Sequence, residues 1–302
     1  MALNADHKTE DVTMRDTVYL DYEADTLYAE YNNRGKVHDY EDFAADWTTR
    51  SDAVRAKYSE ASIDLRYGDG PRETFDLFLP ENENPPLFAF IHGGYWQWNE
   101  KKDYAFLADS FVEAGIGFAN IEYALCPSVT LEQLVDQIRR AFAHLWRNAG
   151  DLGFNRDHIM VSGHSAGGHL AGVVLTTDWA AFGDDLPRNL VRRGMPISGV
   201  FDLEPIRHTP IGDPLGLDAA AAAMLSPMFN QPWAKADTVI AMGAHEGREF
   251  HRQAEEFAAH CRRQGTNVRI NSVFGTNHFS VLETLADPDG ALFKAAKELI
   301  TS

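Results

Sequence analysis

Five residues near the middle of the chain place a serine between two glycines: Gly163-His164-Ser165-Ala166-Gly167. They follow a short apolar run and come immediately before a segment with helical periodicity. Glycines at both second neighbours suit a sharp strand-to-helix turn, because side chains there would collide with the adjoining strand and helix. Such a turn would present the Ser165 hydroxyl at the carboxyl end of a parallel sheet, where open α/β sheets place their sites. The alternative is that these residues form a flexible turn in which Ser165 has no catalytic role.

The serine needs a base, and one histidine stands in a suitable place. A serine hydroxyl is a poor nucleophile at neutral pH, so it requires a general base that is itself oriented by an acid. In this kind of strand, turn and helix arrangement the acid and then the histidine follow the serine along the chain. His278 lies in the loop after the last strand-like segment, 268–274, which is the position required of the base.

Two carboxylates are candidates for the acid. Asp202 follows the strand-like segment 194–200, and Glu246 follows the next one, 237–243. Both positions satisfy the topology. Asp202 also suits a turn or capping residue, where a short carboxylate accepts backbone N–H bonds. The loop that carries Glu246 is short and flanked by glycines.

A second glycine-rich loop, residues 91–98, also follows a buried strand-like run. A tetrahedral oxyanion needs backbone N–H groups that are already oriented toward the developing charge, and glycines let the backbone approach a substrate closely. We therefore assign the oxyanion hole to N–H groups of Gly93, Gly94, Tyr95 and Ala166.

The same loop contains aromatic side chains and a histidine. Tyr95, Trp96 and Trp98 predict an aromatic substrate pocket, because aromatic residues on loops have fewer core partners than those in regular elements. Packing against the core is the alternative for the two tryptophans. We expect His92 to be a buried anchor of the loop and not a second base.

Strand-like and helix-like segments alternate beyond residue 60. The strand-like segments are 62–68, 74–80, 87–94, 117–123, 158–163, 194–200, 237–243 and 268–274, and the helical ones are 103–114, 130–148, 165–175 and 249–263. The first two strands predict an antiparallel hairpin. Helices between apolar strands imply right-handed crossovers, so the fold class is α/β with a mostly parallel central sheet flanked by helices.

We expect a single domain over residues 1–302. Two helices, in the segments 25–35 and 39–58, are expected to pack as an N-terminal helical cap within residues 1–59. A short lid-like insertion is expected at about residues 205–233, after the sixth strand, with a helix at 218–224.

Composition excludes several other classes of protein. The formal net charge is −18, from 45 acidic and 27 basic residues, which opposes binding to nucleic acid or to anionic lipid. Two cysteines suggest neither a disulfide framework nor a thiolate metal site. No secretory signal and no membrane-spanning run are apparent, so we expect a cytoplasmic protein. A homodimer would be an ordinary assembly.

Several motifs resemble the α/β-hydrolases and, within them, the serine-dependent kynurenine formamidase (arylformamidase) group. They cover most of the chain from Tyr28 to Phe279 and are "YNNRGKV", "DLRYGDGPRETFDLFLP", "HGGYWQW", "GHSAGGHLA", "SGVFDLEPI", "LGLD" with "LSP", "GAHEGREFHRQ" and "NHF". Tyr95 stands where the related lipase and esterase group usually has a third glycine, which favours the formamidases. Glu246 matches the family's acid position, where aspartate is common, and we select it over Asp202.

The resemblance implies acyl transfer by Ser165, Glu246 and His278 without a metal or an organic cofactor. The expected partner is a small aromatic amide, such as an N-formyl arylamine, or an ester. Phe279 joins the three aromatic residues of the 91–98 loop as a candidate for substrate binding. Arg207 and His208, in the insertion, are candidates for contacting an amino-acid tail of the substrate. A carboxylesterase or another arylamide amidase with the same triad is the alternative function.

Overall fold

One sheet organises the residues that the structure describes. The structure is a computed structural model that describes residues 16–58 and 62–302. The strands are β1 (Leu65–Arg66), β2 (Thr74–Phe78), β3 (Leu87–Ile91), β4 (Gly117–Ile121), β5 (Ile159–His164), β6 (Arg193–Ile197), β7 (Asp237–Gly243) and β8 (Val268–Val273). The eight strands are ordered β1-β2-β4-β3-β5-β6-β7-β8. Each strand lies within or overlaps a segment that the sequence predicts.

The directions of the strands also agree with the sequence prediction. β2 pairs antiparallel with β1 and with β4, and all other neighbours are parallel. Every residue of β3 and of β5 is buried, as strands covered on both faces require. The mostly parallel sheet with an antiparallel hairpin is therefore confirmed. Parallel strands carry the loops that follow them to one edge of the sheet, and the candidate site residues lie in these loops.

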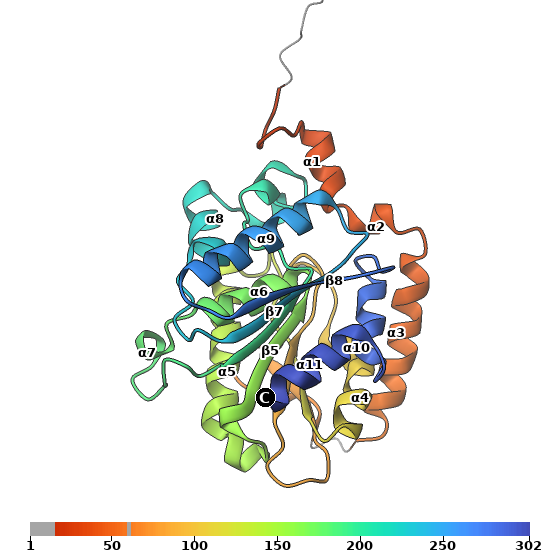
Figure 1. The fold of residues 1–302 in the computed structure, drawn as a ribbon, viewed down its shortest axis with the longest axis vertical. Coiled ribbons are helices and arrows are strands. Elements are labelled where there is room, and N and C mark those ends of the chain that lie inside the picture. The colour runs from red at the N-terminus through yellow and green to blue at the C-terminus, as the bar shows by residue number, and fades with distance from the viewer. Residues whose placement is uncertain (1–15, 59–61) are drawn as a thin grey trace, which may run out of the picture.

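Helices cover both faces of the sheet (Figure 1). Those on one side are α5 (Leu131–Leu152), α6 (Ala166–Thr176) and α9 (Arg248–Arg263), and those on the other are α3 (Tyr40–Arg55), α4 (Ala108–Glu113), α10 (Glu283–Ala286) and α11 (Ala291–Thr301). The longest, α5, begins with a capping box between Thr130 and Gln133 and ends at Gly153, which has φ +86°. The capping box and the terminal glycine can both be read from the local sequence, so the existence of α5 was predictable.

The N-terminal segment differs in detail from the expected pair of helices. The first expected helix is divided into α1 (Ala24–Tyr31) and α2 (Asn33–Lys36), and the second is α3. The division occurs because Asn32 leaves helical geometry, with ψ 67°, and its side chain accepts the Gly35 N–H at 3.1 Å. The remainder of the expected cap, residues 1–15 and 59, lies outside the described residues.

The expected insertion after β6 contains the helix α8 (Ala219–Leu225), which confirms the helix expected at 218–224. Short 3₁₀ turns make up much of the rest. Another short helix, α7 (Trp179–Phe182), lies between α6 and β6. Within residues 16–58 and 62–302, no helix combines the length and the apolar character needed to cross a bilayer.

Candidate active site

Ser165 lies at a sharp turn between β5 and α6. Its backbone has φ 59° and ψ −116°, a strained conformation for a residue with a side chain. The flanking glycines are required by close backbone contacts. A Cβ on Gly163 would lie 2.3 Å from the Gly167 carbonyl oxygen, and one on Gly167 would lie 2.0 Å from the Ile91 carbonyl oxygen. The Gly-x-Ser-x-Gly pattern therefore encodes this turn through sterics.

Glu246 and His278 meet beside this turn. His278 Nδ1 lies 2.7 Å from Glu246 Oε2, and both side chains are buried. The other carboxylate oxygen, Oε1, accepts hydrogen bonds from Ser198 Oγ at 2.5 Å and from the Gly243 N–H at 2.7 Å. Because the carboxylate is held from both sides, it orients the imidazole so that Nδ1 carries the proton and Nε2 is left to act as a base.

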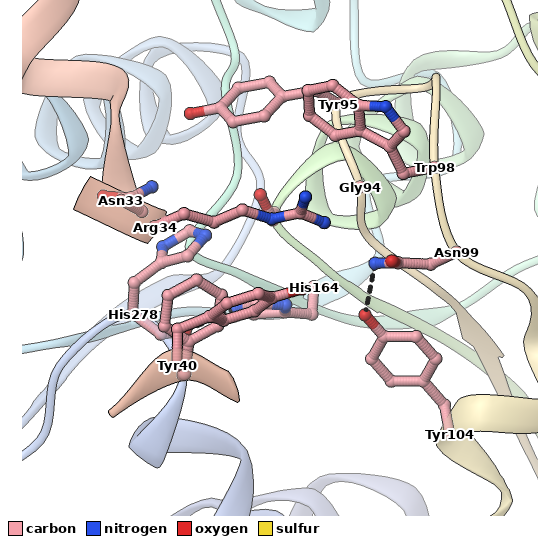
Figure 2. Close-up of a pocket in the computed structure, with 12 residues that line it drawn as sticks. Asn33, Arg34, Tyr40, Gly94, Tyr95, Trp98, Asn99, Tyr104, His164 and His278 are labelled. Atoms are coloured by element: carbon pink, nitrogen blue, oxygen red, sulfur yellow. Dashed lines mark hydrogen bonds between the residues drawn. The ribbon is translucent and has the colours of Figure 1, made fainter. Parts of the chain in front are cut away.

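Ser165 and His278 line one cavity of about 40 Å³. Its other lining residues are Asn33, Arg34, Tyr40, Gly94, Tyr95, Trp98, Asn99, Tyr104, His164 and Phe279, most of which Figure 2 labels. The structure records no hydrogen bond between Ser165 Oγ and His278. In sites without substrate such catalytic hydrogen bonds are often long and tighten only when substrate is bound.

His164, immediately before the serine, has a structural contact and a free ring nitrogen. Its Nε2 lies 2.7 Å from the His278 carbonyl oxygen, so this nitrogen donates its proton and fixes the loop that carries the base. Burial, and then the proximity of His278, hold the pKa of His164 well below its usual value. The imidazole is therefore neutral, and its buried Nδ1 is an unpartnered acceptor at the cavity wall.

The 91–98 loop has the strained backbone expected of a loop built for close approach. Gly94, Tyr95 and Trp96 have φ of 117°, 49° and 60°. Gly94 and Tyr95 line the cavity. Gly93 packs under the turn, since a Cβ there would lie 3.1 Å from Ser165 Cβ. This places the backbone of the loop beside the serine.

The backbone N–H groups assigned to the oxyanion hole are available for a ligand. In the described part of the chain, those of Gly93, Gly94, Tyr95 and Ala166 donate to no acceptor. Ala166 is the first residue of α6, whose initial N–H groups have no partner within the helix. The geometry is compatible with an oxyanion hole at this corner of the cavity.

His92 anchors the loop, as the sequence predicts. Its Nε2 lies 2.9 Å from Glu122 Oε1, and Arg72 contacts the same carboxylate oxygen at 2.7 Å. Burial acts to raise the pKa of Glu122, but His92 and Arg72 outweigh it and the pKa is lowered. Arg72 also donates to the Asn99 carbonyl oxygen at 2.7 Å, which ties the end of the loop to the same cluster.

The aromatic residues predicted to bind substrate are divided between the cavity and the core. Tyr95, Trp98 and Phe279 line the cavity. Trp96 does not: it is fully buried, and its indole N–H donates to His169 Nδ1 at 3.1 Å. Trp96 and Trp98 are only two residues apart but differ in their environment, because the backbone from Gly94 to Trp96 has positive φ angles. The prediction that Trp96 contacts substrate is therefore wrong, and core packing is its role.

Asp202 has a structural role, which the sequence offered as the alternative to its being the catalytic acid. Its Oδ1 accepts the Glu204 N–H at 2.9 Å, and its Oδ2 accepts the Tyr19 hydroxyl at 3.0 Å. Burial raises its pKa, and it does not line the cavity. Of the two carboxylates, only Glu246 contacts His278.

The insertion contributes nothing to the cavity wall. None of residues 205–233 lines the cavity, and Arg207 and His208 instead contact Glu204 at 2.6 Å and 3.1 Å. The insertion is therefore not part of the cavity wall, and the two candidates for the substrate tail do not line the cavity. Part of the cavity wall comes from α2 and the start of α3, through Asn33, Arg34 and Tyr40. The motif "YNNRGKV" contains Asn33 and Arg34, but none of these three residues was assigned to the site from the sequence.

Ser198 is a further residue that the sequence did not indicate. It follows β6, has φ 51°, and donates to Glu246 at 2.5 Å. We expect Ser198→Ala to lower kcat about tenfold, roughly 1.4 kcal/mol, because the carboxylate keeps only the Gly243 N–H as a second support.

Steady-state kinetics with thermal denaturation check this expectation. Ser162→Ala is the matched control, since Ser162 Oγ donates to the Met195 carbonyl oxygen at 2.6 Å and has no hydrogen bond to Ser165, Glu246 or His278. It should change the melting temperature without changing kcat. Equal kcat for wild type and Ser198→Ala would show that Glu246 does not depend on Ser198.

Comparisons with known proteins decide the family. Residues 75–203 match the BD-FAE family. A kynurenine formamidase from Danio rerio is 30% identical over 259 residues, covering 83% of this chain and 86% of the relative. The chain belongs to the kynurenine formamidase family. Another member of the kynurenine formamidase family, from Salmo salar, is 29% identical, covering 76% of this chain and 79% of the relative.

Solved structures agree with this membership of the kynurenine formamidase family. A protein from Silicibacter sp. tm1040, proposed to be a thioesterase, is 30% identical with a TM-score of 0.80, covering 91% of this chain and 99% of that chain. A Pyrobaculum calidifontis esterase at 17% identity has a TM-score of 0.66, covering 94% and 93%. The predicted α/β-hydrolase fold is confirmed, and the chain is a hydrolase.

Proposed function

We propose that this protein hydrolyses the formyl-type amide of an aromatic amine, such as N-formylkynurenine, through an acyl-enzyme on Ser165. The observation that carries the proposal is the buried pair of Glu246 and His278, joined at 2.7 Å, that shares a cavity with Ser165. Relatives named kynurenine formamidase support the choice of substrate class.

The first half of the reaction forms the acyl-enzyme. His278 Nε2 takes the proton of Ser165 as the Oγ attacks the formyl carbon, and the carbonyl oxygen becomes an oxyanion. The N–H groups of Gly94, Tyr95 and Ala166 stabilise this oxyanion, because they are fixed in place before the charge develops. His278 then gives its proton to the amine nitrogen, the carbon–nitrogen bond breaks, and the arylamine leaves.

The second half regenerates the serine. Water attacks the formyl-enzyme while His278 accepts a proton from it. The tetrahedral intermediate then collapses as His278 gives this proton to the departing Ser165 Oγ, which releases formic acid that ionises to formate. Throughout, Glu246 keeps the imidazole oriented and stabilises the imidazolium that forms twice in each cycle.

The size and lining of the cavity support a small acyl group and an aromatic leaving group. The cavity is small, about 40 Å³, which favours a small acyl group such as formyl over a long acyl chain. Tyr95, Trp98 and Phe279 provide flat apolar surface on its wall. Trp98 is 40% exposed, so it lies at the mouth, where a ring leaving the site would pass.

A comparison of substrates tests the proposal. We expect kcat/KM for N-formylkynurenine to exceed that for an N-acetyl arylamine, because a small cavity accommodates the larger acetyl group less easily. Short p-nitrophenyl esters are the third substrate. An advantage of the esters by more than about a hundredfold, roughly 2.7 kcal/mol of transition-state discrimination, would replace the formamidase proposal by a carboxylesterase with the same triad.

A further inference from the structure

An arginine occupies the mouth of the cavity between two aromatic rings. The Arg34 guanidinium carbon lies 4.8 Å from the centroid of the Tyr40 ring and 4.7 Å from that of the Trp98 ring. Figure 2 shows the Arg34 side chain extending across the cavity, with Tyr95 and Trp98 on one side and Tyr40 and His278 on the other. Arg34 is exposed, and its cation–π contacts with the two rings leave its N–H groups able to form hydrogen bonds with a ligand.

The charge of this guanidinium has no carboxylate partner in the part of the chain that the structure describes. No carboxylate within residues 16–58 and 62–302 forms an ion pair with Arg34. The chain has 45 acidic and 27 basic residues, and other arginines near the site, such as Arg72 and Arg252, pair with glutamates. An unpaired arginine held in place by two rings in an acidic protein is poised for an anion supplied from outside.

The neighbouring residue offers a second donor. Asn33 is 4% exposed and lines the cavity, and its buried side-chain Nδ2 has no hydrogen-bond partner. A buried donor without an acceptor costs free energy, so such groups are uncommon unless a ligand satisfies them. In Figure 2 the Asn33 amide lies beside the Arg34 side chain.

We propose that Asn33 and Arg34 form a carboxylate-binding subsite for the leaving-group part of the substrate, so that this hydrolase selects anionic aryl amides. The proposal rests on the proposed function for the identity of the leaving group. Arg34 supplies the charge and a planar pair of N–H groups, which match a carboxylate. Asn33 supplies a neutral donor that gains an acceptor only when the anion is bound. The serine and His278 then act on the amide next to the ring.

Equilibrium binding of product-like amines tests the subsite without any turnover. The probes are the ortho, meta and para aminobenzoates and the corresponding aminobenzamides, which have the same ring and amine and differ in charge. Dissociation constants are measured by calorimetry on the full chain. We expect at least one aminobenzoate to bind about 10- to 100-fold more tightly than its amide, the range expected for a charge-assisted pair of hydrogen bonds.

Variants assign the preference to these residues. Arg34→Gln should bring the ratio of the two dissociation constants close to one, and Asn33→Asp should lower it by pairing a new carboxylate with Arg34. Arg207→Gln is the matched control, because Arg207 pairs with Glu204 away from the cavity, and it should keep the wild-type ratio. Thermal denaturation verifies that each variant is folded.

The proposal would be overturned if the wild type bound every aminobenzoate and its aminobenzamide with equal dissociation constants. It would also be overturned if Arg34→Gln kept the wild-type ratio of these two dissociation constants. Failure to cleave formyl amides would contradict the proposed function alone, since the binding ratio does not depend on turnover. Where cleavage is observed, kcat/KM for a formamidobenzoate over its formamidobenzamide should fall in Arg34→Gln by the same factor as the binding ratio.

Discussion

Ser165→Ala is expected to fold normally and to lose nearly all turnover. The side chain of Ser165 makes no hydrogen bond within the described residues, and alanine meets the same backbone strain at φ 59°, so stability should change little. Removal of the nucleophile abolishes the acyl-enzyme route, and in a serine protease the same change costs roughly 10⁶ in kcat. Steady-state kinetics and thermal denaturation of the purified variant measure both effects.

Covalent labelling of the wild type is a second test of Ser165 as the nucleophile. A sulfonyl fluoride should label the wild type at Ser165 alone, as determined by mass spectrometry of peptides, and should not label Ser165→Ala. Ser162 is a serine of the adjoining strand, fully buried and bonded to the Met195 carbonyl oxygen, so it serves as the internal control for specificity. Retention of more than a few per cent of activity by the alanine variant would require another nucleophile.

Glu246→Gln is expected to lower kcat by about 10⁴ while the fold is retained, as loss of the orienting acid does in serine proteases. The physical reason is the set of donors around the carboxylate. His278 Nδ1 approaches one oxygen, and Ser198 and the Gly243 N–H approach the other. The side-chain amide of a glutamine has only one acceptor oxygen. Its NH₂ group would therefore face one of these donors, or would force the His278 imidazole into the tautomer in which Nδ1 carries no proton.

Two further substitutions make this test specific. Glu246→Asp keeps the charge and should retain partial activity, because a shorter carboxylate lengthens the contact with His278. Asp202→Asn should act mainly through stability, since Asp202 contacts Tyr19 and the Glu204 N–H and not the histidine. A folded but inactive Asp202→Asn beside a near-normal Glu246→Gln would reverse the assignment of the acid.

Much of the fold was predictable because its signals are local. Buried strands such as β3 and β5 are continuous apolar runs, and α5 has a capping box and a terminal glycine. The division of the first expected helix at Asn32 was not predicted, since it depends on one side chain accepting a backbone N–H three residues later. The helices around it were predicted, but their boundaries depend on such single contacts.

The candidate triad was also accessible from the sequence. Glycines at 163 and 167 are needed where two backbones approach within van der Waals contact, and topology assigns Glu246 and His278 to loops that end at the same edge of the sheet. Topology alone left two carboxylates open, Glu246 and Asp202, and the resemblance to the formamidases selected Glu246. The structure distinguishes them by a contact of 2.7 Å between Glu246 and His278, which no spacing rule specifies.

The remaining features of the site depend on tertiary packing. Trp96 and Trp98 are equivalent in the sequence, but the positive φ angles of the loop direct one into the core and the other to the cavity mouth. Asn33 and Arg34 lie more than 100 residues before Ser165, and only the docking of α2 against this edge of the sheet makes them part of its cavity. The sequence by itself indicated the candidate triad, because the steric need for two glycines at the turn and the succession of strands along the chain can be read from local patterns. The tertiary structure decided what surrounds the serine, because contacts between distant segments depend on how the whole chain packs.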